Sequence, residues 1–175
     1  MSAPVAELRR VLDRETALVV RRLRGFTEVR YASAAPPMES RAAVARHLAA
    51  ALAVAGQGVE SAAALDQPQW RTLPDLPVLA LADAVAVTAA DLLGALTAAP
   101  ASTWTPNGRR PTAEVLAAVL AEVLLHRRDL DGSPPGGEAA TVALAVLDPD
   151  APRTPRSLLV EAQRRCAAYR PWRSN

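Results

Sequence analysis

The sequence predicts an all-α protein, built as a four-helix bundle with one or two additional short helices. Alanine accounts for 39 of the 175 residues, and alanine loses no side-chain entropy when it enters a helix. Apolar side chains recur at steps of three and four residues, and no segment shows the clear alternation of a strand. Because aromatic residues make up only 3% of the chain, the helices are expected to pack closely through small side chains.

The first part of the chain predicts two helices. Leucine and valine recur at helical steps over residues 3–31, with arginine and glutamate on the opposite side. A proline pair ends that segment. Ser40 then offers a side-chain oxygen as the N-cap of a helix over residues 41–55, which Gly56 and Gly58 are expected to terminate.

The middle of the chain predicts a loop, a long helix, a linker and a further helix. Residues 66–77 contain three prolines and are expected to form a connecting loop. A long apolar helix follows over residues 78–98 and stops before a proline. After a linker with proline, asparagine and glycine, Thr112 is a suitable N-cap for the next helix. That helix is expected to end before Gly132, with arginines in its last turn.

The C-terminal part predicts shorter helices. Residues 138–147 form a short helix between two proline-containing breaks, and Thr154, followed by a proline, begins a last helix over about residues 154–169. A chain of 175 residues is long enough for one domain with a real core and too short for two ordinary ones. We therefore expect a single domain over residues 1–175, with the bundle core at about residues 5–150.

Charge and composition exclude several classes of protein. The net charge is +2 and no basic run alternates with aromatic residues, so a nucleic-acid partner is not expected. The single cysteine, Cys166, cannot form an intramolecular disulfide and suits a reducing cytoplasm, and the N-terminus lacks a secretory segment. Asp83 and Asp91 interrupt the most apolar stretch, residues 78–96, so no membrane span is expected. The apolar long helix could support a homodimer.

Three ionisable side chains in apolar helical segments are the candidate functional residues. Glu122 and His126 are four residues apart, which places them about 40° apart around a helix axis with Cβ atoms roughly 5–6 Å apart. The chain has two histidines, and the other, His47, lies on the expected inward face of its own alanine-rich helix. Two imidazoles and one carboxylate can bind a metal ion and leave one position open.

The alternative is that these residues are ordinary helix residues. Each histidine would then be a hydrogen-bonded core residue, and Glu122 would be solvated or would pair with an arginine. An ionised carboxylate buried without a partner costs several kcal/mol, so a buried Glu122 needs a metal or a cation beside it. Asp129 continues the stripe of Glu122 and His126 and could orient a ligand, and Arg127 is a second such candidate.

Two segments resemble a known family. Residues 44–50, VARHLAA, are similar to the histidine segment in the second helix of DinB-like metalloenzymes. Residues 122–130, EVLLHRRDL, resemble the second ligand segment of the mycothiol-dependent maleylpyruvate isomerase branch of that superfamily, its metal-binding N-terminal domain. The resemblance implies a four-helix bundle that binds a divalent metal, usually zinc, through His47, Glu122 and His126. It also implies an isomerase or S-transferase that uses mycothiol, bacillithiol or another low-molecular-weight thiol.

The chemistry of such a site leaves three classes open. A zinc ion with three protein ligands lowers the pKa of a bound water or thiol, so a small thiol could react with an electrophilic small-molecule substrate. The same bundle could instead support hydrolysis, a biosynthetic cyclisation or iron chemistry, since two histidines and a carboxylate also bind non-haem iron. The third class is a metal- or ligand-binding protein without turnover.

Overall fold

Helices make up most of the structure, a computed structural model that describes residues 2–98, 100–132, 137–148 and 150. The chain is mainly helical, as the sequence predicts. The described elements are four long helices, α1 (Ala3–Arg24), α3 (Arg41–Glu60), α4 (Leu81–Ala95) and α5 (Thr112–Asp131), two shorter ones, α2 (Glu28–Ala32) and α6 (Gly137–Leu147), the 3-10 turns η1 (Val78–Ala80) and η2 (Leu96–Ala98), and two strands, β1 (Ser102–Thr105) and β2 (Gly108–Pro111).

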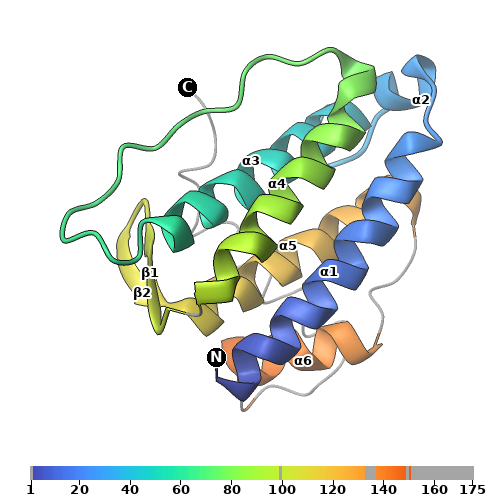
Figure 1. Cartoon of the computed structure of the whole chain (residues 1–175). Helices are drawn as coiled ribbons and strands as arrows, with labels where there is room; N and C mark the ends of the chain where they lie inside the picture. Colours follow the sequence, from blue (N-terminus) through green and yellow to red (C-terminus); the bar gives the residue numbers. More distant parts are fainter. Residues whose placement is uncertain (1, 99, 133–136, 149, 151–175) are drawn as a thin grey trace.

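The four long helices surround one core. α3 packs against α4 and α5, and α1 packs against the same two helices (Figure 1). Each contributes leucines without exposed surface, among them Leu8, Leu48, Leu92 and Leu120. Burying one such side chain contributes roughly 1.5–3 kcal/mol, so the core rests on leucine and valine while alanine lets the helices approach. α6 packs against α5 and α1 at one end.

The helix predicted over residues 3–31 consists of two helices. α1 ends at Arg24, and the backbone N–H of Gly25 donates to carbonyls of the last turn. α2 then begins with its own cap, because the Thr27 side chain accepts a hydrogen bond from the N–H of Arg30. The glycine ends one helix and the threonine two residues later caps the next. These local signals override the apolar pattern, which continues through both helices.

Gly56 and Gly58 do not end α3 as predicted, since the helix continues to Glu60. Both glycines are buried within it. A Cβ atom on Gly58 would lie 2.1 Å from the carbonyl oxygen of Trp104, closer than any real contact. Gly58 therefore has a packing role: because it lacks a side chain, strand β1 can lie directly against the helix backbone.

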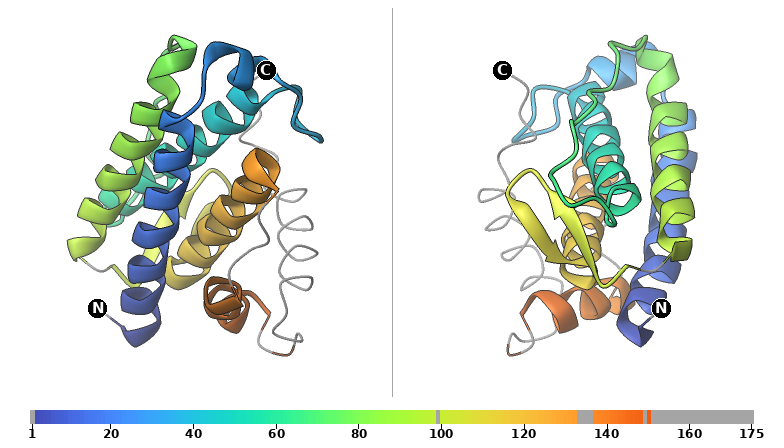
Figure 2. Two further views of the ribbon diagram at one scale, coloured as in Figure 1. Left: turned by 90° about the vertical axis from the view of Figure 1, so that its right-hand side faces the viewer. Right: turned by 60° about the vertical axis from the view of Figure 1, so that its left-hand side comes forward.

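The linker before α5 is a β-hairpin, which the sequence prediction missed. β1 and β2 pair antiparallel from Ser102–Pro111 to Thr105–Gly108 around a two-residue turn, and Gly108 has a φ of +100°. Figure 2 shows the hairpin beside α3 and α5. The N-cap of α5 is Pro111 rather than the predicted Thr112, which is the buried first residue of the helix. The predicted helix over residues 154–169 and Cys166 lie outside the described residues.

Two helical stretches are long and apolar enough to cross a membrane, judged by length and composition alone: Arg41–Glu60 and Val78–Ala98. Of the most apolar window in each, 61% of the first and 33% of the second is buried inside the protein. A core helix of a water-soluble protein passes the same test, so this is weak evidence for a membrane. The prediction of no membrane span stays a prediction.

Candidate metal centre

Helix α5 carries two of the three candidate ligands in its most apolar stretch. Its buried residues run almost without interruption from Val115 to His126, so the helix contacts neighbours on nearly all sides. Glu122 is 9% exposed and His126 5% exposed, one helical turn apart. A carboxylate and an imidazole buried side by side in such a helix need a polar or charged partner.

Helix α3 supplies the third candidate, His47, because it runs antiparallel to α5 at a defined register. Arg41 at the start of α3 donates from Nε to the carbonyl oxygen of Leu130 near the end of α5, at 3.1 Å. His47 follows Arg41 by six residues and His126 precedes Leu130 by four, so the two histidines lie within about one helical turn of each other along the axes. The His47 side chain is 20% exposed and lies at the border of the buried face of α3.

The three side chains meet within the span of one metal ion. The Oε2 atom of Glu122 lies 3.1 Å from His126 Nε2 and 3.7 Å from His47 Nε2, and the three ligand atoms lie within 4.8 Å of one another. Ligand atoms at about 2.0–2.1 Å around a tetrahedral zinc ion are about 3.3 Å apart. The two distances from Glu122 bracket that value, so this group could hold a metal ion with a small inward shift of His47.

The two imidazoles lie around this point without stacking. Their ring centroids are 5.1 Å apart and their planes are inclined by 76°. Among the described residues, neither ring nitrogen of His126 makes a hydrogen bond of acceptable geometry, although Glu122 Oε2 is within range. His126 is therefore poorly explained as a hydrogen-bonded core histidine, the alternative that the sequence left open. A metal ion would satisfy its Nε2.

Asp129 lies on the far side of the His126 ring. Its Oδ2 is 3.7 Å from His126 Nδ1, its side chain is 4% exposed, and Arg128 donates to its Oδ1 from Nε and Nη2 at 3.1 and 2.8 Å. Burial acts to raise the pKa of Asp129, but the neighbouring His126 and Arg128 outweigh it and lower that pKa. Asp129 is thus held as a carboxylate where it can orient His126.

The two carboxylates also act on His126 itself. Burial alone would lower the pKa of this imidazole, but Asp129 and Glu122 more than compensate and raise the pKa to about 9. Without a metal, the cluster therefore favours a proton on His126. A divalent cation would take the place of that positive charge between the same carboxylates.

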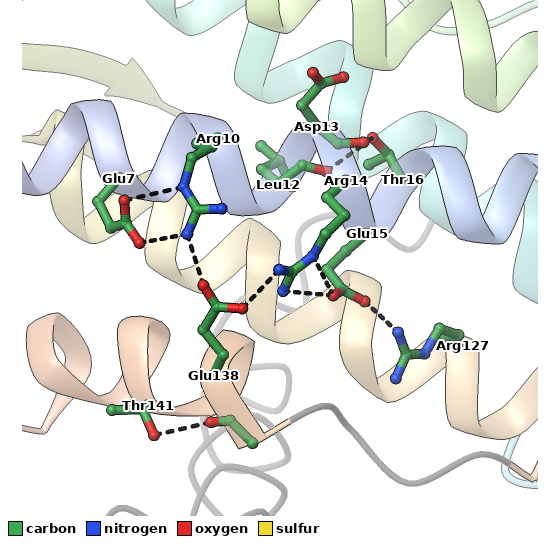
Figure 3. Close-up of polar contacts among 11 residues, drawn as sticks. Glu7, Arg10, Leu12, Asp13, Arg14, Glu15, Thr16, Arg127, Glu138 and Thr141 are labelled. Atoms are coloured by element: carbon green, nitrogen blue, oxygen red, sulfur yellow. Dashed lines mark hydrogen bonds and ion pairs between the residues drawn. The ribbon is translucent and has the colours of Figure 1, made fainter.

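Arg127 does not face the three-residue cluster. Its Nη1 donates to Oε2 of Glu15 on α1, and Glu15 also pairs with Arg14 at 3.2 Å (Figure 3). Glu15 is 2% exposed, a buried carboxylate that reasoning from the sequence missed. The signal was present, since Glu15 lies four residues after Val11 and four before Val19, both on the buried face of α1.

The same network joins three helices. Glu138 at the start of α6 accepts from Arg10 and from Arg14, each at 2.6 Å (Figure 3). Exposed ion pairs of this kind add little to the stability of the fold, because solvent screens them. Their role is to set where α6 docks, and they lie apart from the candidate metal ligands.

Trp70 and Trp104, both in segments predicted to be linkers, do not contribute to the cluster. Trp104 packs its ring under Arg109 of the hairpin, with the guanidinium 4.5 Å from the ring centroid, and donates to the carbonyl of Ala64. Trp70 lines a separate pocket on the outer side of α3.

Comparisons with known proteins found no match, whether with protein-family models, with curated proteins or with solved structures. The resemblance to DinB-like metalloenzymes therefore stays an expectation from the sequence. A metal at this site is supported by the donor set and by its geometry.

Proposed function

We propose that this chain is a divalent-metal enzyme that uses zinc to activate a small thiol or water for S-transfer to, or isomerisation of, a small electrophilic substrate. One observation carries the proposal: His47, Glu122 and His126 come from two helices and place their ligand atoms within 4.8 Å of one another. Two histidines and a glutamate are a ligand set of catalytic zinc sites, which keep a fourth position for water or substrate.

The protein's own residues have distinct roles in this proposal. His47 and His126 bind through Nε2, and Glu122 binds through Oε2, the atom that both imidazoles approach. The carboxylate of Asp129, whose Oδ2 lies 3.7 Å from His126 Nδ1, favours the tautomer with the proton on Nδ1 and so leaves Nε2 for the metal. Zinc, when bound, lowers the pKa of a thiol or water in its open position to near neutrality. His47 is the most exposed of the three ligands, so a small substrate can reach the metal from its side of the site.

The finer part of the fold prediction belongs to the same proposal. α1, α3, α4 and α5 each pack against two of the others, which supports a DinB-like four-helix bundle with α2, α6 and the hairpin as additions. Together with the two resembling segments, this favours mycothiol or a related thiol as co-substrate, a cytoplasmic location and a small-molecule substrate. Metal sites in helical bundles are commonly built from side chains on facing helices, as here on α3 and α5.

Metal analysis of the protein, purified without an affinity tag, tests the first step. We expect about one zinc ion per chain in the wild type and loss of that metal in His47→Ala and His126→Ala. Glu114→Gln is the matched control, since Glu114 lies in the first turn of the same helix, away from the cluster, and this variant should keep its metal. Full metal in both histidine variants would end the proposal.

A conjugation assay tests the reaction itself. The zinc-loaded protein is incubated with mycothiol or bacillithiol and with an electrophile such as a halogenated arene, and the thioether is quantified by mass spectrometry. We expect turnover that depends on Glu122 and both histidines. Iron as the bound metal, with oxygen-dependent turnover, would contradict the thiol chemistry and favour the iron class. Bound metal with no turnover on any thiol would favour a binding protein.

A further inference from the structure

The outer side of α4 is apolar although it is exposed. Its exposed residues include a stripe at steps of four, three and four residues, formed by Asp83, Val87, Ala90 and Gly94. Val87 is 58% exposed, and Asp83 and Asp91 are the two charged residues of the helix. The outer face of a helix in water normally carries many charged residues, whereas apolar residues at these steps are typical of a seam between helices.

Helix α1 lies beside α4, and the two form one layer of the molecule, with α3 and α5 in the other layer (Figure 2). They run in opposite directions (Figure 1). Arg24 Nη2 donates to Asp83 Oδ1 at 2.9 Å, so Arg24 on α1 lies level with the start of the α4 stripe. Asp13 precedes Arg24 by eleven residues and Gly94 follows Asp83 by eleven, so Asp13 lies level with the end of that stripe.

The layer therefore carries opposite charges at its two ends. Arg24 is exposed at one end, and Asp13 is exposed at the other. Asp13 projects from the side of α1 opposite to the pair of Arg14 and Glu138 (Figure 3), and its carboxylate forms no ion pair within the described part of the chain. Between the two ends lie small or apolar side chains, Ala17 on α1 and Val87 with Ala90 on α4.

We propose that this layer is the interface of a twofold-symmetric homodimer, in which α1 faces α1 and α4 faces α4 of the second copy. A twofold axis that brings Asp13 of one copy to Arg24 of the other forms the same pair at both ends. The same register places Val87 against Ala90 of the second copy and Asp83 against Gly94. In each pair the larger side chain meets a smaller one, so the helices can approach closely.

The charges favour a second copy over a membrane surface as the occupant. Asp13, Asp83 and Asp91 would lie against anionic head groups on a membrane, which is unfavourable. A second copy instead supplies a guanidinium for Asp13. The area is modest, because α4 has 15 residues and spans roughly 22 Å. We therefore expect a dissociation constant in the micromolar range. The metal ligands lie on α3 and α5, so the proposal does not depend on the metal chemistry.

Sedimentation velocity of the full chain, up to about 0.2 mM, measures self-association. We expect a reversible monomer–dimer equilibrium that is the same with and without zinc. Val87→Arg should raise the dissociation constant more than about tenfold, because it places two guanidinium groups in the apolar centre of the interface. Val29→Arg is the matched control at an 81% exposed position of α2 and should have no effect. Circular dichroism melting verifies folding.

A charge exchange tests the register. Asp13→Arg and Arg24→Asp should each weaken self-association about tenfold, because each places like charges together at both ends of the interface. An equimolar mixture of the two variants should dimerise again. One end of the mixed dimer then joins the new arginine to the new aspartate, and the other end keeps the native pair. Asp66→Arg, at an exposed position of the connector between α3 and α4, should leave wild-type association unchanged and should not complement Arg24→Asp.

Four results would overturn the inference. A wild-type chain that stays monomeric at the highest concentration would exclude the dimer, and a dimer that Val87→Arg leaves intact would place the interface elsewhere. A mixture of the two charge variants that stays monomeric would exclude this register. A monomer that cosediments with phosphatidylglycerol vesicles, and loses that binding in Val87→Arg, would assign the layer to a membrane surface instead.

Discussion

His126 Nε2 lies 3.1 Å from Glu122 Oε2, one turn earlier on the same buried helix, and this pair is the centre of the candidate site. The sequence alone determines their proximity, because α-helical geometry brings residues four apart to the same side. Burial determines the chemistry, since a proton or a metal cation between a carboxylate and an imidazole removed from water stabilises both groups. Substitutions and pH can separate those two states.

Replacement of Glu122 by glutamine should remove the metal while leaving the shape of the side chain. The neutral amide is a poor ligand for zinc, and the loss should exceed the roughly 10- to 100-fold drop in affinity typical of residues that only orient a ligand. Competition with a fluorescent zinc chelator measures it, with Glu114→Gln as control. Unchanged affinity in Glu122→Gln would show that the carboxylate is no ligand.

Replacement of Asp129 by asparagine should weaken zinc binding by about 10- to 100-fold without abolishing it. Asp129 Oδ2 is 3.7 Å from His126 Nδ1, so its charge orients the ring and strengthens Nε2 as a ligand. The same chelator competition applies. Asp13→Asn, at an exposed position of α1, should change nothing, and an equal loss in both variants would refute a specific role for Asp129.

The metal-free protein should lose stability as the pH rises from neutrality to above 9. The pKa of His126 is raised to about 9 in the folded protein by Asp129 and Glu122, against the opposing effect of burial. An unfolded histidine has a pKa of about 6.5, so the folded state binds the extra proton between these values. This stabilisation is complete below pH ~6.5 and is lost as the pH rises through the folded-state value, a change of about 3 kcal/mol at most.

Urea unfolding of the metal-stripped protein at a series of pH values measures this dependence. His126→Ala should flatten the profile between pH ~6.5 and ~9, because it removes the titrating group. Zinc should flatten it as well, since the metal replaces the proton. A wild-type stability that is constant or rises over this range would contradict the prediction.

Replacement of Glu15 by glutamine should destabilise the fold by about 3 kcal/mol, because it removes the charge of a buried carboxylate that pairs with both Arg14 and Arg127. Glu15 is 3% exposed at its side chain and Arg127 13%. Glu7→Gln is the matched control on the same helix: Glu7 is 45% exposed, and its replacement should destabilise the fold much less than Glu15→Gln. Denaturant unfolding measures both. Equal effects would show that the Glu15–Arg127 pair adds nothing beyond surface charge.

The features that the sequence could predict are those set by interactions between residues close together in the chain. The spacing of Glu122 and His126 is local, and the helical class follows from alanine content and periodicity, so both are accessible without a structure. The meeting with His47 depends on how α3 and α5 align, which Arg41 and the Leu130 carbonyl help to set. The sequence offers His47 as a candidate because the chain has two histidines, and only packing brings it to Glu122.

The elements that the sequence analysis did not predict are either very short or depend on contacts between distant parts of the chain. The hairpin has strands of four residues, which are too short for a clear period-two pattern. It also depends on packing of β1 against α3, which lies far away in the sequence. Gly25 with Thr27 ends α1 through caps that the continuing apolar pattern conceals. The prediction that Gly58 stops the helix follows from a common role of glycine, whereas the actual cause is the close approach of Trp104.

Replacement of Gly58 by alanine tests whether the close approach of Trp104 requires a glycine there, with Gly94, which has no such neighbour, as the comparison. The new Cβ would lie 2.1 Å from the carbonyl oxygen of Trp104, a backbone atom that cannot rotate away, so the hairpin must shift. We expect a loss of about 1–3 kcal/mol, typical of overpacking. Gly94 lies in α4, and beyond the backbone of its own helix no described atom lies within 4 Å of the point that a Cβ would occupy there. Gly94→Ala should therefore stabilise by about 0.5–1 kcal/mol. Opposite signs in thermal unfolding would confirm that α3 keeps Gly58 for contact with the hairpin; a stabilising Gly58→Ala would refute it, since helix propensity alone favours alanine at both positions.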